Sequence, residues 1–174
     1  DKIHSMGLKF GIHIMRGIAR QAVHRNTRIY GTTARARDIA SQFSLCPWNT
    51  DMYGVDTEKR GAEEYYDSLF KLYASWGVDF VKVDDIANTE FSPQNPYSAE
   101  KEIEMIRAAI DRSGRDMVLS LSPGPAPLNK AEHLSENANM WRISGDFWDR
   151  WDKLLNMFSL CEKWYLYVKD GSFP

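Results

Sequence analysis

The sequence predicts a parallel α/β fold, and within that class part of a (β/α)8 TIM barrel. Short apolar runs alternate with helical patterns along the 174 residues, in the order β-α-β-α-β-α-β-α. The runs are continuously apolar rather than alternating, which is typical of strands covered on both faces. A complete barrel needs about 250 residues, so we expect residues 1–174 to be a single partial catalytic domain with both flanks missing.

The first two predicted strands are separated by a long polar segment and a helix. Residues 9–14 form an apolar run, and we expect a buried strand there. Residues 16–57 show no clear period, so we expect an irregular loop, which at this length is usually functional. The pattern then predicts a helix at 61–76, a stop at Gly77 and a strand at 78–83. The apolar positions that predict this helix are Tyr65, Leu69, Leu72, Tyr73 and Trp76.

The next helix is predicted from about residue 98 to residue 113. Ser98 is the expected N-cap, and Glu102 is placed as in a capping box. The face expected to be buried consists of Ile103, Ile106 and Ile110.

Two further strands and two helices complete the predicted order. The strands are expected at 117–121 and 140–143. The proline-rich segment 122–127 between them cannot be helix or central strand. Helices are predicted at about 129–136 and 147–164, and we expect the last one to bury Trp151, Leu154, Leu155 and Phe158.

Composition and charge exclude some classes of partner. The formal net charge is −2 and the basic residues are spread along the chain, so nucleic acid is not an expected partner. No apolar run approaches the roughly 18 residues of a membrane span. Cys46 and Cys161 match no metal-binding spacing, and we expect two buried free thiols. The oligomeric state and the compartment stay open, with a secreted or periplasmic location preferred.

One predicted strand ends in a pair of carboxylates. Asp84 comes at the end of the strand, directly after residues 78–83, and strand periodicity puts Lys82 on the same side as Asp84, in the barrel interior. A buried lysine beside a carboxylate keeps that carboxylate ionised, which suits a nucleophile. The alternative is a structural ion pair at the strand end. Asp85 points the opposite way, and we expect it to cap a helix or a loop.

Another carboxylate, Asp146, follows Gly145 after the strand at 140–143. Taken alone it is an N-cap, which is a common role for aspartate. Arg142 on the preceding strand favours a functional role, because its guanidinium can bind a sugar hydroxyl or set the neighbouring acid. Such barrels keep their chemistry at the carboxyl ends of the strands, and two carboxylates are the minimum that a glycoside hydrolase needs.

Three further residues are candidates for a sugar-binding site. His13 lies near the end of the strand at 9–14, where a lone histidine is more often a core residue. Arg16 and Trp48 are candidate sugar contacts, since an indole can stack on a pyranose face. The Ser-Pro-Gly stretch at 122–124 lacks the Gly-x-Ser-x-Gly pattern of a nucleophile elbow.

The run at 76–84, Trp-Gly-Val-Asp-Phe-Val-Lys-Val-Asp, resembles the strand-four signature of the α-galactosidase and α-N-acetylgalactosaminidase family, which is glycoside hydrolase family 27. The resemblance implies that Asp84 is the nucleophile and that Lys82 binds substrate. The Trp-Arg pair at 141–142, followed by Asp146, is similar to the strand-six signature. That similarity implies an arginine in contact with the sugar and a general acid/base at Asp146.

Two other segments extend the resemblance, so that about strands three to six are covered. Residues 4–12 are similar to the entry into strand three. Residues 118–122 resemble strand five and the loop that selects the 2-substituent of the sugar. Ser122 stands at the selecting position, where a small residue is typical of members that accept an N-acetyl group. His13 stands where the family usually has tyrosine.

The chain departs from the family directly after the nucleophile. Asp85 and Ile86 stand where the family usually has asparagine or glycine followed by cysteine. The usual disulfide from that cysteine therefore cannot form, and Cys46 lacks its usual partner.

The resemblance implies a retaining exo-α-glycosidase that hydrolyses terminal α-galactose or α-N-acetylgalactosamine by double displacement, without a metal or cofactor. The expected partner is an oligosaccharide or glycoconjugate substrate. Two alternatives stay open, namely a non-catalytic carbohydrate-binding barrel and a barrel enzyme in which Lys82 forms a Schiff base. The residues expected to bind substrate are Lys82, Arg142, His13, Ser122 and Trp48.

Overall fold

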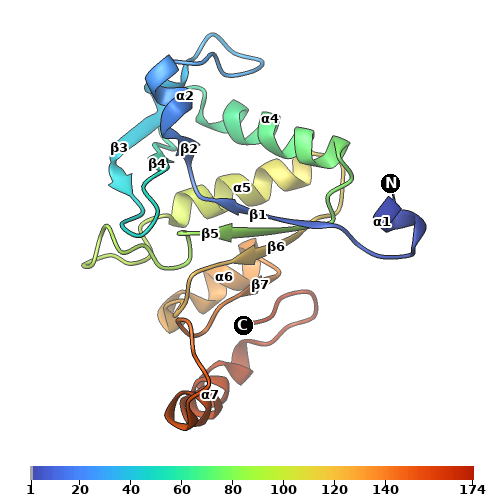
Figure 1. Ribbon diagram of the computed structural model, residues 1–174, viewed down its shortest axis with the longest axis vertical. Coiled ribbons are helices and arrows are strands. Elements are labelled where there is room, and N and C mark those ends of the chain that lie inside the picture. The colour runs from blue at the N-terminus through green and yellow to red at the C-terminus, as the bar shows by residue number, and fades with distance from the viewer. Residues whose placement is uncertain (1) are drawn as a thin grey trace.

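A computed structural model describes residues 2–174, and its main feature is a four-stranded parallel sheet in the order β1-β5-β6-β7 (Figure 1). Each strand pairs in parallel with the next one in this series, as successive strands of a (β/α)8 barrel do. The predicted fold class is therefore confirmed. The strands are β1 (Gly11–Met15), β5 (Phe80–Asp84), β6 (Val118–Leu121) and β7 (Met140–Trp141).

Helices connect these strands. α4 (Ala62–Ser75) precedes β5, and α5 (Glu100–Arg112) connects β5 to β6. The two helices lie side by side along β1 and β5 (Figure 1). Gly77 has a φ of 76° and ends α4 where the sequence predicts. α1 (Lys2–Ser5) precedes β1, and the 3₁₀ turn η1 (Leu128–Lys130) and α6 (Ala131–Asn137) connect β6 to β7.

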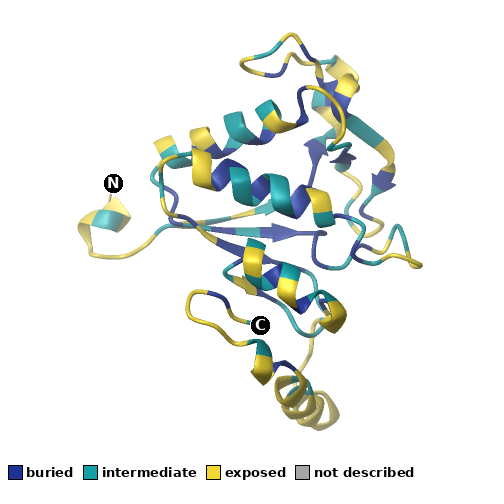
Figure 2. Cartoon of the chain, turned by 180° about the vertical axis from the view of Figure 1, so that it is seen from behind, coloured by how far each residue is buried: buried dark blue, intermediate teal, exposed yellow. Residues whose placement is uncertain are grey.

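The core lies between the strands and the helices, where Figure 2 shows the buried residues in dark blue. α5 contributes the predicted isoleucines at 103, 106 and 110. α4 contributes Tyr66 and Phe70, whereas the expected Leu72 and Trp76 are exposed. Alternate residues of a strand point to opposite faces, so Lys82 and Asp84 share the face away from this core. The buried strand residues are Val81, Val83, Leu119 and Leu121.

The segment 16–57 is not the irregular loop that the sequence predicts. It forms a three-stranded antiparallel sheet in the order β2-β4-β3 together with two short helices. Its elements are too short to show a period, but their apolar residues Ile18, Val23 and Ile39 are buried. The elements are β2 (Ile18–Ala19), α2 (Arg20–Arg25), α3 (Ala36–Ile39), β3 (Ala40–Leu45) and β4 (Met52–Val55).

The predicted capping box of α5 is also wrong. The N-cap is Ala99, and no side chain caps this helix end. The Ser98 hydroxyl instead lies 2.6 Å from the Thr89 hydroxyl. Glu102 is buried and accepts hydrogen bonds from Arg16 and Tyr66, because two other elements approach this turn.

The last helix, α7 (Trp151–Trp164), begins four residues later than predicted and is followed by the 3₁₀ turn η2 (Tyr165–Tyr167). The residues expected to be buried are exposed, with Trp151 at 74% and Phe158 at 67% (Figure 2). Trp164 is its buried residue. The apolar stripe is present, but no described segment covers it. Among the described residues no helix combines the length and apolar character needed to cross a membrane.

Candidate active site

Asp84 ends β5, and its two carboxylate oxygens have different surroundings. Oδ1 accepts a hydrogen bond of 2.9 Å from the Ser122 hydroxyl and one of 3.0 Å from the Asp85 backbone N–H. Oδ2 lies 3.3 Å from His13 Nε2 and 3.8 Å from Lys82 Nζ. One oxygen is thus fixed by neutral donors, while the other faces two basic side chains.

The register of the sheet explains why these groups meet. β1 and β5 align so that His13 stands opposite Lys82 and Met15 opposite Asp84. His13 and Lys82 therefore project from neighbouring strands on the same face. The His13 side chain is 54% exposed and contacts Asp84. It is therefore not a core residue, which is the more common position for a lone histidine in an apolar strand.

Asp146 lies in the loop after β7 and not at a helix start, so the N-cap alternative is wrong. Its Oδ1 pairs with Arg142 Nη2 at 2.7 Å. The Asp146 side chain is 75% exposed, and that of Arg142 is 31% exposed. This ion pair agrees with one of the two roles open to Arg142, that of setting the neighbouring acid, and leaves its contact with a sugar a prediction.

The two acids line the same cavity, which has a volume of about 620 Å³. This volume lies within the usual range of small-ligand sites. The cavity brings together five of the predicted site residues, which are Trp48, Lys82, Asp84, Arg142 and Asp146. Its other lining residues are Asn88, Glu90, Pro123, Gly124, Pro125 and Gly145.

Asn88 and Glu90 were missed by the sequence interpretation. Both lie in the loop that follows β5, and Asn88 Nδ2 donates a hydrogen bond of 2.8 Å to the Pro125 carbonyl. Both residues could have been found from their position, because they come just after a strand that ends in a candidate nucleophile. Loops at this end of the strands build the binding site of a barrel.

Ser122 lies beneath Asp84 rather than in the cavity wall. The side chain is fully buried, and its hydroxyl donates to the Asp84 carboxylate. The residues of the same loop that do line the cavity are Pro123, Gly124 and Pro125. Contact between this hydroxyl and the 2-substituent of a sugar has no support in this geometry.

The loops that follow β6 and β7 pack directly against each other at Gly124. A Cβ atom at this position would lie 1.9 Å from the Ser144 carbonyl oxygen. The position therefore requires glycine because of space and not because of its φ angle. This contact places the proline-rich loop beside the loop that carries Asp146.

Arg16 and Asp85 do not have the roles predicted for them. Arg16 is 3% exposed and pairs with Asp85 at 2.7 Å and with Glu102 at 2.8 Å, so it is not a sugar contact. Burial lowers the pKa of Arg16, but the charges of Glu102 and Asp85 outweigh it and the pKa is raised. Asp85 is 2% exposed and serves this ion pair instead of a cap.

The cysteines differ from each other. Cys46 is buried and Cys161 is exposed, so the expectation of two buried thiols is wrong for Cys161. Burial, followed by the charge of Asp85, raises the pKa of the Cys46 thiol to about 11.

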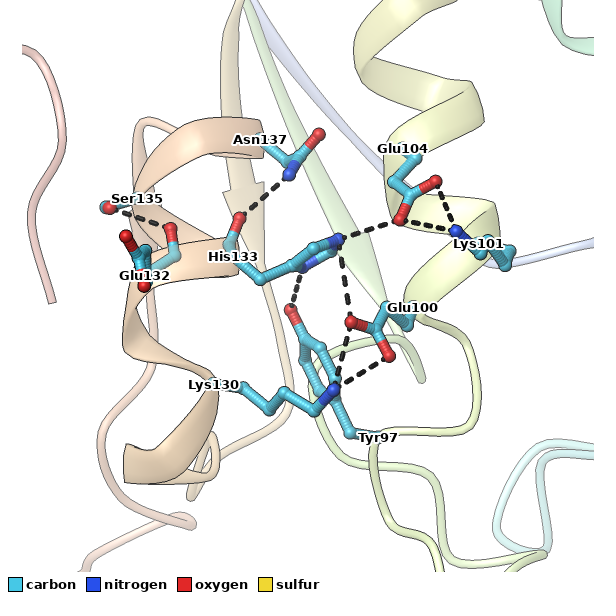
Figure 3. A network of polar contacts seen from close by, with 9 residues as sticks. All are labelled: Tyr97, Glu100, Lys101, Glu104, Lys130, Glu132, His133, Ser135 and Asn137. Atoms are coloured by element: carbon cyan, nitrogen blue, oxygen red, sulfur yellow. Dashed lines mark hydrogen bonds and ion pairs between the residues drawn. The ribbon is translucent and has the colours of Figure 1, made fainter.

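A second polar cluster joins α5 to α6 away from the cavity (Figure 3). His133 Nε2 lies 3.2 Å from Glu104 and 3.9 Å from Glu100. The two glutamates already pair with lysines, Glu100 with Lys130 at 2.9 Å and Glu104 with Lys101 at 3.0 Å. We interpret this cluster as a charge-balanced contact between two helices.

The family model described as alpha galactosidase A (Melibiase_2) matches residues 49–169. This chain belongs to that family, glycoside hydrolase family 27 (GH27). The resemblance seen in the sequence is thereby confirmed.

Solved structures of GH27 proteins agree with this assignment. A β-L-arabinopyranosidase of GH27 from Geobacillus stearothermophilus is 63% identical, with a TM-score of 0.94 over 98% of this chain and 38% of that one. An Asp-to-Ala variant of the same enzyme has been solved in complex with arabinose and gives a TM-score of 0.95. A Bacillus halodurans protein proposed to be an α-N-acetylgalactosaminidase is 55% identical, with a TM-score of 0.76 over 97% of this chain and 37% of that one.

A less similar relative is alpha-galactosidase 3 of Hypocrea jecorina. It is 30% identical over 126 residues, which are 69% of this chain and 19% of that protein. The chain thus spans a minor part of the length of each relative, and the fold it describes is part of a barrel.

Proposed function

We propose that the protein containing this chain is a retaining exo-glycosidase that removes a terminal pyranose of galactose configuration. The observation that carries the proposal is that Asp84 and Asp146 line one cavity at the carboxyl edge of the parallel strands. Two carboxylates around one glycosidic bond are what retaining hydrolysis requires.

In the proposed mechanism Asp84 attacks the anomeric carbon through Oδ2. Ser122 and the Asp85 N–H hold Oδ1, so the carboxylate is fixed in orientation before the attack. Asp146 gives its proton to the leaving oxygen in this first step. In the second step Asp146 takes a proton from the water that displaces Asp84, and the sugar leaves with its configuration retained.

Two side chains beside Asp84 have supporting roles in this proposal. Lys82 Nζ and His13 Nε2 both approach Oδ2, at 3.8 Å and 3.3 Å, and flank the oxygen that attacks. Lys82 lines the cavity and is also placed to donate to a sugar hydroxyl. Trp48 supplies an apolar surface at the cavity wall, on which a pyranose face can stack.

Three sugars share the ring configuration that we propose. L-Arabinopyranose in the β linkage has the hydroxyl arrangement of α-D-galactose and lacks only the hydroxymethyl group at C5. The 63% identity to a β-L-arabinopyranosidase makes β-L-arabinopyranose our first candidate. Terminal α-galactose and α-N-acetylgalactosamine, which the sequence motifs imply, are the other two.

The test measures turnover of the three corresponding aryl glycosides by the full-length protein and by its Asp84→Asn variant. We expect the variant to lose about 10³-fold or more in kcat/KM. We also expect a fluorosugar to leave a covalent adduct on the peptide that contains Asp84. Full turnover by the variant, or a first product of inverted configuration, would contradict the proposal. Borohydride trapping on Lys82 would instead support the Schiff-base alternative.

A further inference from the structure

Asp85, the residue after the proposed nucleophile, has an uncommon backbone conformation. Its φ angle is 58°, and Asn26 is the other described non-glycine residue with a positive φ. Residues with a Cβ atom adopt this left-handed backbone region at a cost in free energy. Such strain persists where the surrounding structure enforces it. The conformation matters because the Asp85 N–H donates to Asp84 Oδ1 at 3.0 Å.

Arg16 holds this turn from the buried side. Its backbone N–H donates to the Asp84 carbonyl at 2.9 Å, and its Nε donates to the Asp85 carbonyl at 2.6 Å. Its Nη2 donates to Asp85 Oδ2 at 2.7 Å. Three bonds from one residue therefore fix the peptide units on both sides of the turn.

The guanidinium is itself held in place by other elements. Arg16 Nη1 donates to Glu102 of α5 at 2.8 Å and to Ser44 of β3 at 2.9 Å. Tyr66 of α4 donates to the second oxygen of Glu102 at 2.6 Å. Gly54 of β4 leaves room for the guanidinium, because a Cβ there would lie 2.4 Å from Arg16 Nη1.

We propose that Asp85 and Arg16 are positioning residues for Asp84, in that Arg16 enforces the left-handed turn that aims the Asp85 N–H at Oδ1. The described residues that line the cavity include neither of them, so they act through Asp84 and not on the substrate. The inference rests on the proposed function of Asp84 as nucleophile.

The test uses a series of substitutions at Asp85 in the full-length protein. Glycine adopts a positive φ freely and asparagine tolerates it, whereas alanine and valine resist it. Asp85→Gly and Asp85→Asn should therefore keep the rate of covalent trapping on Asp84 by a fluorosugar within about threefold. Asp85→Ala and Asp85→Val should slow the rate of trapping about tenfold or more. Their KM for the aryl glycoside should stay nearly unchanged. In Asp85→Gly the charge of Arg16 is still balanced by Glu102.

Arg16→Lys is the second arm of the test. Lysine keeps the positive charge but has one nitrogen, which cannot bond to the Asp85 carbonyl, the Asp85 carboxylate and Glu102 in the geometry of the guanidinium. We expect slower trapping here too. Asp79→Asn is the matched control, since it removes another buried carboxylate that pairs with an arginine, one residue before the opposite end of β5. It should lower thermal stability without slowing the trapping step.

The outcomes separate the two proposals. No adduct on Asp84 in the unsubstituted protein would overturn the proposed function and this inference together. An adduct that forms at equal rates in all Asp85 variants would overturn the inference alone. An equal loss of trapping rate in the glycine, asparagine and valine variants would also overturn the inference, since the Asp85 carboxylate itself would then be required. If Asp85→Val does not fold, the alanine and glycine variants decide.

Discussion

The Ser122 hydroxyl, at the end of β6, donates a 2.9 Å hydrogen bond to Oδ1 of Asp84 at the end of β5. This bond crosses between neighbouring strands and joins a fully buried side chain to the proposed nucleophile. It gives the residue a role in fixing a carboxylate, where the sequence suggested a role in choosing the sugar.

Ser122→Ala is predicted to lower kcat about tenfold, because a hydrogen bond to a charged group is worth about 1.5–3 kcal/mol. The loss should be similar for all three aryl glycosides, because the hydroxyl is buried away from the cavity. Steady-state kinetics on the three substrates measure this. Ser172→Ala is the control, since it removes a buried serine hydroxyl that bonds to a carbonyl outside the cavity. A change in sugar preference in Ser122→Ala would restore the selecting role.

Asp146→Asn is predicted to behave differently from Asp84→Asn. An aryl leaving group needs little protonation, so the attack of Asp84 on the sugar should proceed. Hydrolysis of the resulting glycosyl-enzyme, which needs a base, should slow by about 10²–10⁴-fold. Added azide, which attacks without base catalysis, should restore turnover in Asp146→Asn and give a glycosyl azide of retained configuration. Rates with and without azide, and NMR of the product, measure this. Failure of azide to accelerate Asp146→Asn would argue against its acid/base role.

Asp79 is predicted to contribute pH-dependent stability. Hydrogen bonds from the Phe10 N–H, from His4 and from Arg115 hold the pKa of this carboxyl well below its ordinary value of 3.8. A pKa that is lower in the folded state means that folding favours the ionised form. The contribution is therefore complete above the ordinary pKa and is lost as the pH falls toward the folded value.

The measurement compares urea unfolding of the full-length protein with that of Asp79→Asn. The gap in unfolding free energy should be widest near neutral pH and should narrow between about pH 4 and pH 2. A gap that is constant across this range would show that the ion pair does not carry the difference.

Cys46 is predicted to resist alkylation in the folded protein. Its thiol is buried and its pKa is raised to about 11, so almost no thiolate exists near pH 8. Peptide mass analysis after iodoacetamide treatment should find Cys46 unmodified in buffer and modified in denaturant. Rapid labelling under native conditions would contradict the burial of this residue. The Cys46→Ser variant identifies the signal of the peptide.

The alternation of strands and helices and the two acids could be predicted because each rests on a local pattern. Asp84 and Asp146 each follow an apolar run, and parallel strands bring such ends to one edge of the sheet. The sheet within 16–57 was missed because its strands are two to six residues long, too short for a period to be read.

The Arg16 network could not be predicted because it depends on distant pairings. Arg16 bonds to Asp85, 69 residues away, and to Glu102, 86 residues away. Glu102 looked like a cap because spacing within one helix was the only information available. The apolar face of α7 was predicted correctly from its helical spacing. Spacing within one helix does not show whether another segment covers that face.

The contact at Gly124 joins the proline-rich loop that lines the cavity to the loop that carries Asp146, the proposed acid/base. A Cβ at this point has no room against Ser144, which lies two residues before Asp146. Any remodelling of the proline-rich loop to admit a larger sugar would push on the acid as well. Under the proposed function, substrate range and proton delivery are therefore mechanically coupled, and we expect a change in one to need a compensating change in the other.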